Sequence, residues 1–247
     1  MYSSIVEILE TSFGNRWFLD SGSLLGVIRD GKFLPQDKGI DISVLVDNYF
    51  DVEIENNVQK FEKIGFVISR RKWENGIYKY CLSPKLFSSF PYAIDLHLFV
   101  KNGEDYCCPQ FSLIKRERGI KRLFANLKNG HMFTFQTTWK GITRYVIYAI
   151  VSLLYRDIFQ YFNQPVDVKR SFEKGLVTPY IWTIPINLLK STEIGQYCGL
   201  RVISSPEKYL EYRYGDWKKP VTDWNTLRDD GAIRKSSKEE ISKLFNR

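Results

Sequence analysis

The first hundred residues alternate between helical and strand-like patterns of apolar positions. Residues 3–13 carry apolar side chains at helical spacing, which predicts an amphipathic helix. Short apolar runs at 17–19, 40–46 and 92–100 predict strands, with a helix between the second and third. Asn75-Gly76 sits between two further strand-like runs and is the strongest short signal for a hairpin. These elements predict an α/β (α+β) fold with a mixed sheet.

The pattern is weaker after residue 110. Residues 141–161 are the most apolar stretch, but Arg144, Arg156 and Asp157 interrupt it and it is too short to span a bilayer. We favour a buried core helix here. The alternative is a helix that lies against a membrane surface.

A later helix is expected to begin at Pro206, with Ser205 as its cap. The polar residues after Pro220 are expected to be loosely ordered as far as a terminal helix within 233–245. We therefore predict a core over residues 1–110. Residues 111–247 are expected to form a helical C-terminal elaboration packed on that core and not an independent domain.

Composition narrows the class of protein. The chain has 247 residues, 44% of them hydrophobic and 26% charged, which is a globular balance. A net charge of +8 suits anionic membranes, phosphate-bearing substrates or nucleic acid, but no nucleic-acid motif is present, so we expect no nucleic-acid partner. The four cysteines show no metal-ligand spacing, and the first residues show no signal peptide. Both observations favour a cytoplasmic protein.

The stretch from Arg16 to Leu45 carries the strongest chemical signal. A strand leads into the small residues Ser21, Gly22 and Ser23, where a helix begins. We expect Ser21 to cap that helix, and its free amides and positive dipole end to hold a phosphate that Gly22 allows to approach closely. The next strand brings Asp41, with Asp37 just before it, towards the same place. Carboxylates beside a phosphate site are the usual arrangement for metal-assisted chemistry.

Two motifs in this sequence resemble those of the LicD / fukutin family. The first is Ser-Gly-Ser-Leu-Leu-Gly-Val-Ile-Arg at 21–29, followed by Phe-Leu-Pro-Gln-Asp-Lys-Gly-Ile-Asp-Ile at 33–42. The second is Tyr-Leu-Glu-Tyr-Arg-Tyr-Gly-Asp-Trp-Lys-Lys-Pro at 209–220, which is similar to a late element of the family. The motifs occur in the family's order and bracket most of the chain.

The resemblance implies a nucleotidyltransferase-like fold and a transferase. The reaction implied is transfer of phosphocholine, glycerol phosphate or ribitol phosphate from a CDP-linked donor to a saccharide or lipid-linked glycan, with Mg²⁺ or Mn²⁺ as cofactor. Such an acceptor would place the protein at the inner face of the membrane, in peripheral contact with it. The implied catalytic and metal-binding residues are Asp41, Asp95 and Asp37. The implied substrate-binding residues are Ser21, Gly22, Ser23, Arg29, Lys38, Tyr214, Asp216 and Trp217.

Gly39 departs from the family's pattern of three alternating carboxylates, because it stands where the middle one would be. Alternate residues of a strand share a face, so Asp41 lacks its usual partner. Asp95 interrupts an apolar strand and fills the place of the family's third carboxylate; an exposed strand edge is the plainer interpretation. His97 shares the face of Asp95 and is either a base or, more often for a lone histidine, a structural residue. The alternative function is a non-catalytic protein that binds nucleotide or glycan with a degraded metal site.

Overall fold

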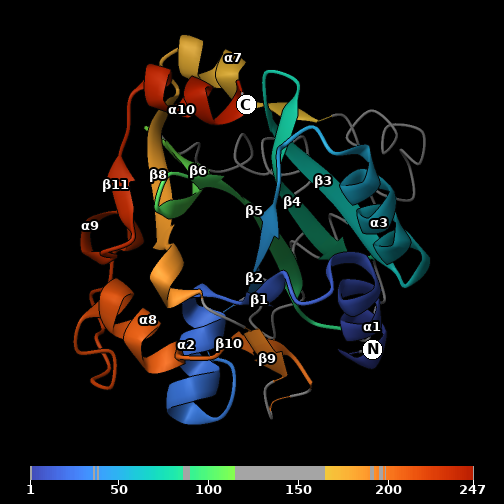
Figure 1. Cartoon of the computed structure of the whole chain (residues 1–247), viewed down its shortest axis with the longest axis vertical. Helices are drawn as coiled ribbons and strands as arrows, with labels where there is room; N and C mark the ends of the chain where they lie inside the picture. Colours follow the sequence, from blue (N-terminus) through green and yellow to red (C-terminus); the bar gives the residue numbers. More distant parts are fainter. Residues whose placement is uncertain are drawn as a thin grey trace, which may run out of the picture.

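Strand β5 (Ala93–Asn102) is the centre of a nine-stranded mixed sheet in the computed structural model (Figure 1). The structure describes residues 2–35, 37, 39–85, 90–114, 165–189, 192–194, 197 and 199–246. Strand β2 (Gly39–Val46) pairs with β5 in parallel along its length, and β1 (Trp17–Leu19) pairs antiparallel with β2. The rest of the sheet runs in the order β11-β8-β6-β5-β4-β3-β7. The mixed α+β sheet expected from the sequence is therefore confirmed.

The N-terminal elements follow the predicted pattern. Helix α1 (Tyr2–Phe13) buries Ile5, Leu9 and Phe13, and α3 (Val52–Lys63) packs against it beside the sheet. The hairpin of β3 (Phe66–Trp73) and β4 (Gly76–Pro84) turns at the predicted Asn75-Gly76. A Cβ on Gly76 would come within 2.6 Å of the Phe245 ring, so this glycine also allows the C-terminal helix to pack closely.

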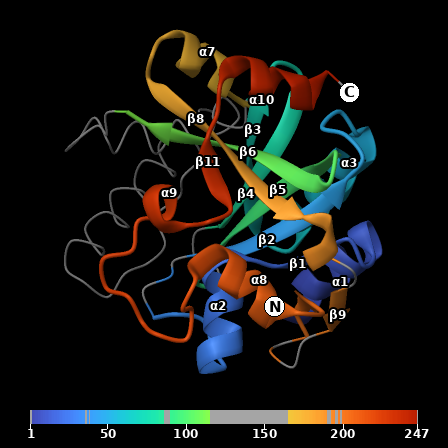
Figure 2. The same ribbon diagram turned by 60° about the vertical axis from the view of Figure 1, so that its left-hand side comes forward.

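The C-terminal half extends the same sheet. Strand β6 (Asp105–Leu113) pairs with β8 (Val177–Pro185) over nine residues, and β11 (Ile233–Lys235) pairs with β8 (Figure 2). The expectation of a helical elaboration over residues 111–247 did not place β8 and β11 in this sheet. The remaining elements are β7 (Val166–Asp167), α7 (Val168–Glu173), η1 (Ile186–Leu188), β9 (Thr192–Ile194), β10 (Arg201–Ile203), α8 (Pro206–Tyr214), α9 (Thr226–Asp229) and α10 (Lys238–Phe245).

The expectation of a loosely ordered segment after Pro220 is wrong from Thr226 onward, whereas the terminal helix expected within 233–245 is confirmed as α10. Residues 226–246 form α9, β11 and α10, and they bury Asp230, Ala232 and Ile241. Helix α10 begins with a capping box, in which Ser237 and Glu240 each accept from the other's backbone N–H. This segment looked loosely ordered from its sequence because the residues on its outer face are polar, whereas its apolar face packs on the sheet.

The apolar stretch 141–161 lies outside the described residues, so neither interpretation of it is tested. Within the described part of the chain, no helix is long and apolar enough to cross a membrane. Cys81, Cys107 and Cys108 are buried thiols, as expected for reduced cysteines.

Candidate active site

Helix α2 (Ser21–Asp30) begins at a buried aspartate and not at the expected serine. Asp20 is the N-cap: its backbone is extended, and its carboxylate accepts from the Ser21 N–H at 2.6 Å. Ser21 itself has a φ of +52°, in the left-handed region. The chain therefore leaves β1 and enters α2 through a sharp bend, and the prediction of Ser21 as the cap is wrong by one residue.

Asp20 is fully buried and is held by four donors. Besides Ser21, its carboxylate accepts from the Ser43 hydroxyl, from the Tyr209 hydroxyl at 2.9 Å and from Arg213. Burial raises the pKa of Asp20, while Arg213 and the hydrogen bonds oppose that rise. The late motif at 209–220 thus meets the first motif in space, and helix α8 packs against α2 (Figures 1 and 2).

Arg213 links three distant segments. Its guanidinium also binds the buried Asp230, and it lies 4.3 Å from the centre of the Trp182 ring. Burial disfavours the charge, but Tyr214, Tyr209 and the two aspartates outweigh it and raise the pKa of Arg213. Arg213 also contacts the Ser21 hydroxyl at 3.2 Å, so the start of α2 is fixed by a residue of the second motif.

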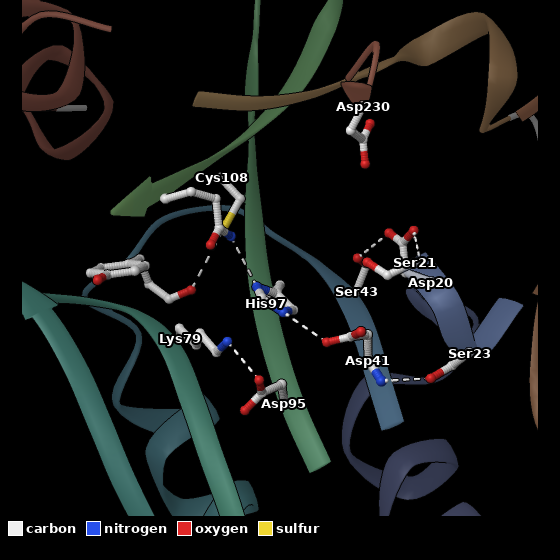
Figure 3. A network of polar contacts seen from close by, with 12 residues as sticks. Asp20, Ser21, Ser23, Asp41, Ser43, Lys79, Asp95, His97, Cys108 and Asp230 are labelled. Carbon is white, nitrogen blue, oxygen red and sulfur yellow. Dashed lines mark hydrogen bonds and ion pairs between the residues drawn. The ribbon is translucent and has the colours of Figure 1, made fainter. Parts of the chain in front are cut away.

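Asp41 and Asp95 lie side by side on neighbouring strands. They are register partners in the parallel β2–β5 ladder, and His97 follows on the same face of β5 (Figure 3). One ligand atom from each of the three lies within 4.8 Å of the others. His97 Nε2 is 3.4 Å from Asp41 Oδ1. Two sequence-predicted carboxylates and the histidine therefore form one cluster.

Lys79 places a positive charge beside this cluster. Its Nζ donates to Asp95 Oδ2 at 2.7 Å from the adjacent strand β4. Burial tends to raise the pKa of Asp95, but the Lys79 ammonium outweighs it and holds that pKa well below the usual range. Burial tends to lower the pKa of Lys79, and Asp95 raises it in turn. Both groups are therefore charged at neutral pH.

Asp37 lies over the start of α2. A Cβ on Gly22 would be 2.6 Å from Asp37 Oδ2, so the glycine makes room for the carboxylate. Burial and the nearby Asp41 raise the pKa of Asp37 to about 6. Gly39 faces the backbone carbonyl of Ala93, which a Cβ would meet at 3.3 Å. The two carboxylates that flank Gly39 in sequence are thus close in space, and no third one stands between them.

Three other predicted residues are Ser23, Arg29 and Lys38. Ser23 is buried, and its hydroxyl accepts from the Asp41 N–H at 3.0 Å, so it positions β2 and does not line the cavity. Arg29 lines the cavity but is paired with Asp30 at 2.9 Å. Lys38 lies outside the described residues.

A cavity of about 540 Å³ opens over Asp37 and Asp41, and Asp95 is not among its lining residues. Ser21, Gly22, Asp37 and Asp41 line one side, and the predicted residues of the second motif line another: Tyr214, Asp216 and Trp217. The lining residues that sequence reasoning missed include Lys79, Gln110, Trp182 and Arg213. Lys79 offered one signal, since it stands between Tyr78 and Tyr80 in an otherwise apolar strand.

Comparison with known proteins agrees with the geometry. Residues 14–107 match the model of the LicD/FKTN/FKRP nucleotidyltransferase domain. The chain contains a LicD-family domain. The LicD match covers Asp20, Asp37, Asp41, Lys79, Asp95 and His97, and it ends before the second motif. No curated protein matches the chain. A LicD-family domain suggests a transferase of the phospho-alcohol type.

Proposed function

We propose that the protein transfers a phospho-alcohol, such as phosphocholine, glycerol phosphate or ribitol phosphate, from a CDP-linked donor to a glycan. One observation carries this proposal: the Asp41–Asp95–His97 cluster lies in the LicD domain, beside the start of α2 and a cavity of about 540 Å³. A helix start attracts phosphate, and adjacent carboxylates suit a divalent ion. The cavity has the size of a site for a nucleotide-sized ligand.

The charges at this site fit a bound divalent cation. Asp37 and Asp41 repel each other enough to contribute to the raised pKa of Asp37, and a cation between them would relieve that repulsion. Asp41, Asp95 and Asp37 would hold Mg²⁺ or Mn²⁺. When bound, the ion would neutralise the donor's diphosphate and stabilise the departing CMP.

The remaining residues would bind and orient the two substrates. The Gly22 amide at the start of α2, with Arg29 and Lys38, would hold the phosphates. Tyr214 and Trp217 would stack on the cytosine or ribose, and Asp216 would accept from a sugar hydroxyl. Asp95 would be the group that accepts the proton of the acceptor hydroxyl, and its ion pair with Lys79 makes it a weaker base than a free carboxylate. Positioning and charge neutralisation would supply most of the rate.

The acceptor proposed is a saccharide or a lipid-linked glycan. The net charge of +8 supports peripheral contact with an anionic membrane, at its cytoplasmic face. Residues 1–110 would form the catalytic core, and the later residues would complete the cavity without forming a separate domain.

The test is donor turnover over a panel of CDP-alcohols and metals. We expect wild type to release CMP from at least one CDP-alcohol, and Asp41→Asn and Asp95→Asn each to abolish release while the fold is retained. Asp47→Asn is the matched control, because Asp47 lies just after β2 with its side chain 89% exposed. Wild-type inertness towards every CDP-alcohol and metal would contradict the proposal.

Gly39 and the Lys79–Asp95 ion pair favour one alternative. A protein that binds nucleotide without transferring anything would retain the cavity while its metal site lost a carboxylate. Calorimetry and CMP release distinguish the transferase from this binding protein. The binding protein would bind CDP-alcohols with or without metal, and would never release CMP.

A further inference from the structure

His97 is a potential metal ligand beside Asp41, on the side away from Gly39: in the β2–β5 register His97 pairs with Ser43, and Gly39 pairs with Ala93. On the face that holds Asp41, β2 has Gly39 where an alternating carboxylate would stand. On the neighbouring strand, His97 follows Asp95 on the same face, and its Nε2 points at Asp41 (Figure 3). Its side chain is 5% exposed, so the ring is enclosed except where it faces the cluster.

The surroundings of His97 fix the plane and direction of its ring. Gln110 on β6 lies 3.0 Å from Nδ1, and the Trp182 ring lies edge-on at 5.1 Å. A metal-bound histidine almost always gives its second ring nitrogen to a polar partner, which sets the tautomer and holds the ring. Gln110 is such a partner, and it leaves Nε2 directed into the cluster.

We propose that His97 Nε2 binds the divalent ion together with Asp41, and so supplies a ligand on the side of Asp41 opposite to Gly39. Asp95 lies within the same cluster but shares its charge with Lys79. The site would then offer nitrogen and oxygen ligands. Imidazole suits transition metals, whereas Mg²⁺ prefers oxygen ligands throughout. The inference rests on the proposed function only for the role of the ion, and predicts that this site prefers Mn²⁺ to Mg²⁺.

The proton on the ring can be accommodated without a change of charge. With the Gln110 amide nitrogen against Nδ1, the ring proton is on Nε2 and is shared with Asp41. A half-turn of the amide presents its oxygen to Nδ1. The proton then resides on Nδ1, and the Nε2 lone pair is free for the ion. Neutral imidazole is the binding form in either case.

The sequence makes a direct spectroscopic test practical. The chain has two histidines, His97 and His131. Protein labelled with ¹⁵N only at histidine should show a nitrogen coupling to bound Mn²⁺ in pulsed electron paramagnetic resonance. His131→Gln, the matched control, should retain this coupling, and His97→Gln should lose it while circular dichroism shows an unchanged fold. The spectra are recorded with Mn²⁺ alone and with Mn²⁺ plus CDP.

Calorimetry gives a second measurement. Wild type should bind Mn²⁺ more tightly than Mg²⁺, and His97→Asp should narrow or reverse that preference. Gln110→Leu should weaken Mn²⁺ binding by roughly 10- to 100-fold, the usual loss when the partner of a metal-bound histidine is removed. Gln110→Glu, which can still accept from Nδ1, should retain most of the affinity.

Three outcomes would overturn the proposal: Mn²⁺ bound without nitrogen coupling, coupling that disappears in His131→Gln, or no Mn²⁺ binding even with CDP. None of these measurements requires turnover. If the coupling is present but no CDP-alcohol releases CMP, the proposed function fails and the His97 site stands.

Discussion

Lys79 is a built-in cation of the carboxylate cluster, 2.7 Å from Asp95. In the free protein it would compete with the proposed metal ion for that carboxylate. Two unit charges about 4 Å apart interact by roughly 4 kcal/mol near a protein surface, so this competition is large. The site is therefore balanced between an internal cation and an external one.

Lys79→Met should increase the affinity of the free protein for Mn²⁺ at least tenfold, or about 1.4 kcal/mol. The reason is that Asp95 loses its cation and the cluster gains one negative charge. Calorimetry measures the affinity, and Mn²⁺ should raise the thermal midpoint of the variant more than that of wild type. Lys63→Met, at an exposed position on α3, is the control. An unchanged or weaker affinity would show that Lys79 and the metal do not compete.

Arg213→Lys should destabilise the protein by about 3–5 kcal/mol, the usual cost of leaving one partner of a buried ion pair uncompensated. A lysine keeps the charge but has no planar fork to bind Asp20 and Asp230 together. Urea unfolding followed by circular dichroism measures the loss. A change below about 1 kcal/mol would mean that the Asp20–Arg213–Asp230 network contributes little.

At the residue scale, the acidic residues of the site could be predicted from the sequence more readily than the basic residues that pair with them. Asp41 and Asp95 could be predicted because each interrupts an apolar strand, where a carboxylate requires compensation. Lys79 and Arg213 could not be assigned, because pairing depends on which strands and helices become neighbours. Asp20 and Arg213 are 193 residues apart, and no local sequence pattern predicts a contact between residues at that separation.

At the scale of elements, local signals predicted local structure. The hairpin at Asn75-Gly76 and the strand–helix–strand unit around α2 depend on turn chemistry and periodicity, both of which are readable within about ten residues. The pairing of β8 with β6 is different, because it joins segments separated by residues 114–176. Short strands such as β11 gain their order from that sheet and not from their own sequence.

Helix α10 illustrates a cap whose contribution depends on pH. The Arg234 side chain, then the Ser237 backbone N–H and the Ser236 hydroxyl, lower the pKa of Glu240 to about 2 from its usual 4.5. A lowered pKa means that the stabilisation is fully present above pH 4.5 and is lost as the pH falls towards 2. Glu240 is 42% exposed, so screening keeps this contribution small.

Glu240→Gln should therefore lower the free energy of unfolding at pH 7 by about 1 kcal/mol or less. The difference from wild type should shrink between pH 4.5 and 2, and urea unfolding over that range measures it. Glu239→Gln on the same helix is the comparison, since Glu239 does not pair with Arg234. A difference that is independent of pH would assign the effect to helix propensity instead.

At the scale of the whole molecule, the sheet and the buried Arg213 network connect the two halves of the chain. The β6–β8 ladder spans nine register pairs, and the cavity takes its walls from both the LicD domain and residues 182–233. The residues matched by the family model, 14–107, therefore form only one portion of the site, and later residues complete it.

We predict that the whole chain unfolds in a single cooperative transition. Scanning calorimetry should give equal calorimetric and van't Hoff enthalpies. Residues 1–114 alone should fail to unfold cooperatively, because β6 would lose its partner and Asp20 would be buried without Arg213. Two separate transitions, or a stable truncated fragment, would instead indicate two independent domains.

The Asp20–Arg213 contact can form only late in the synthesis of the chain. A ribosome adds about 5–20 residues per second, so Arg213 is synthesised roughly 10–40 s after Asp20, given their separation of 193 residues. Until then, the first turn of α2 has its capping carboxylate but not the arginine that neutralises it. The nascent chain would carry the predicted phosphate-binding segment well before Arg213 holds that segment in place. The proposed site would therefore be complete only after Arg213 has been synthesised.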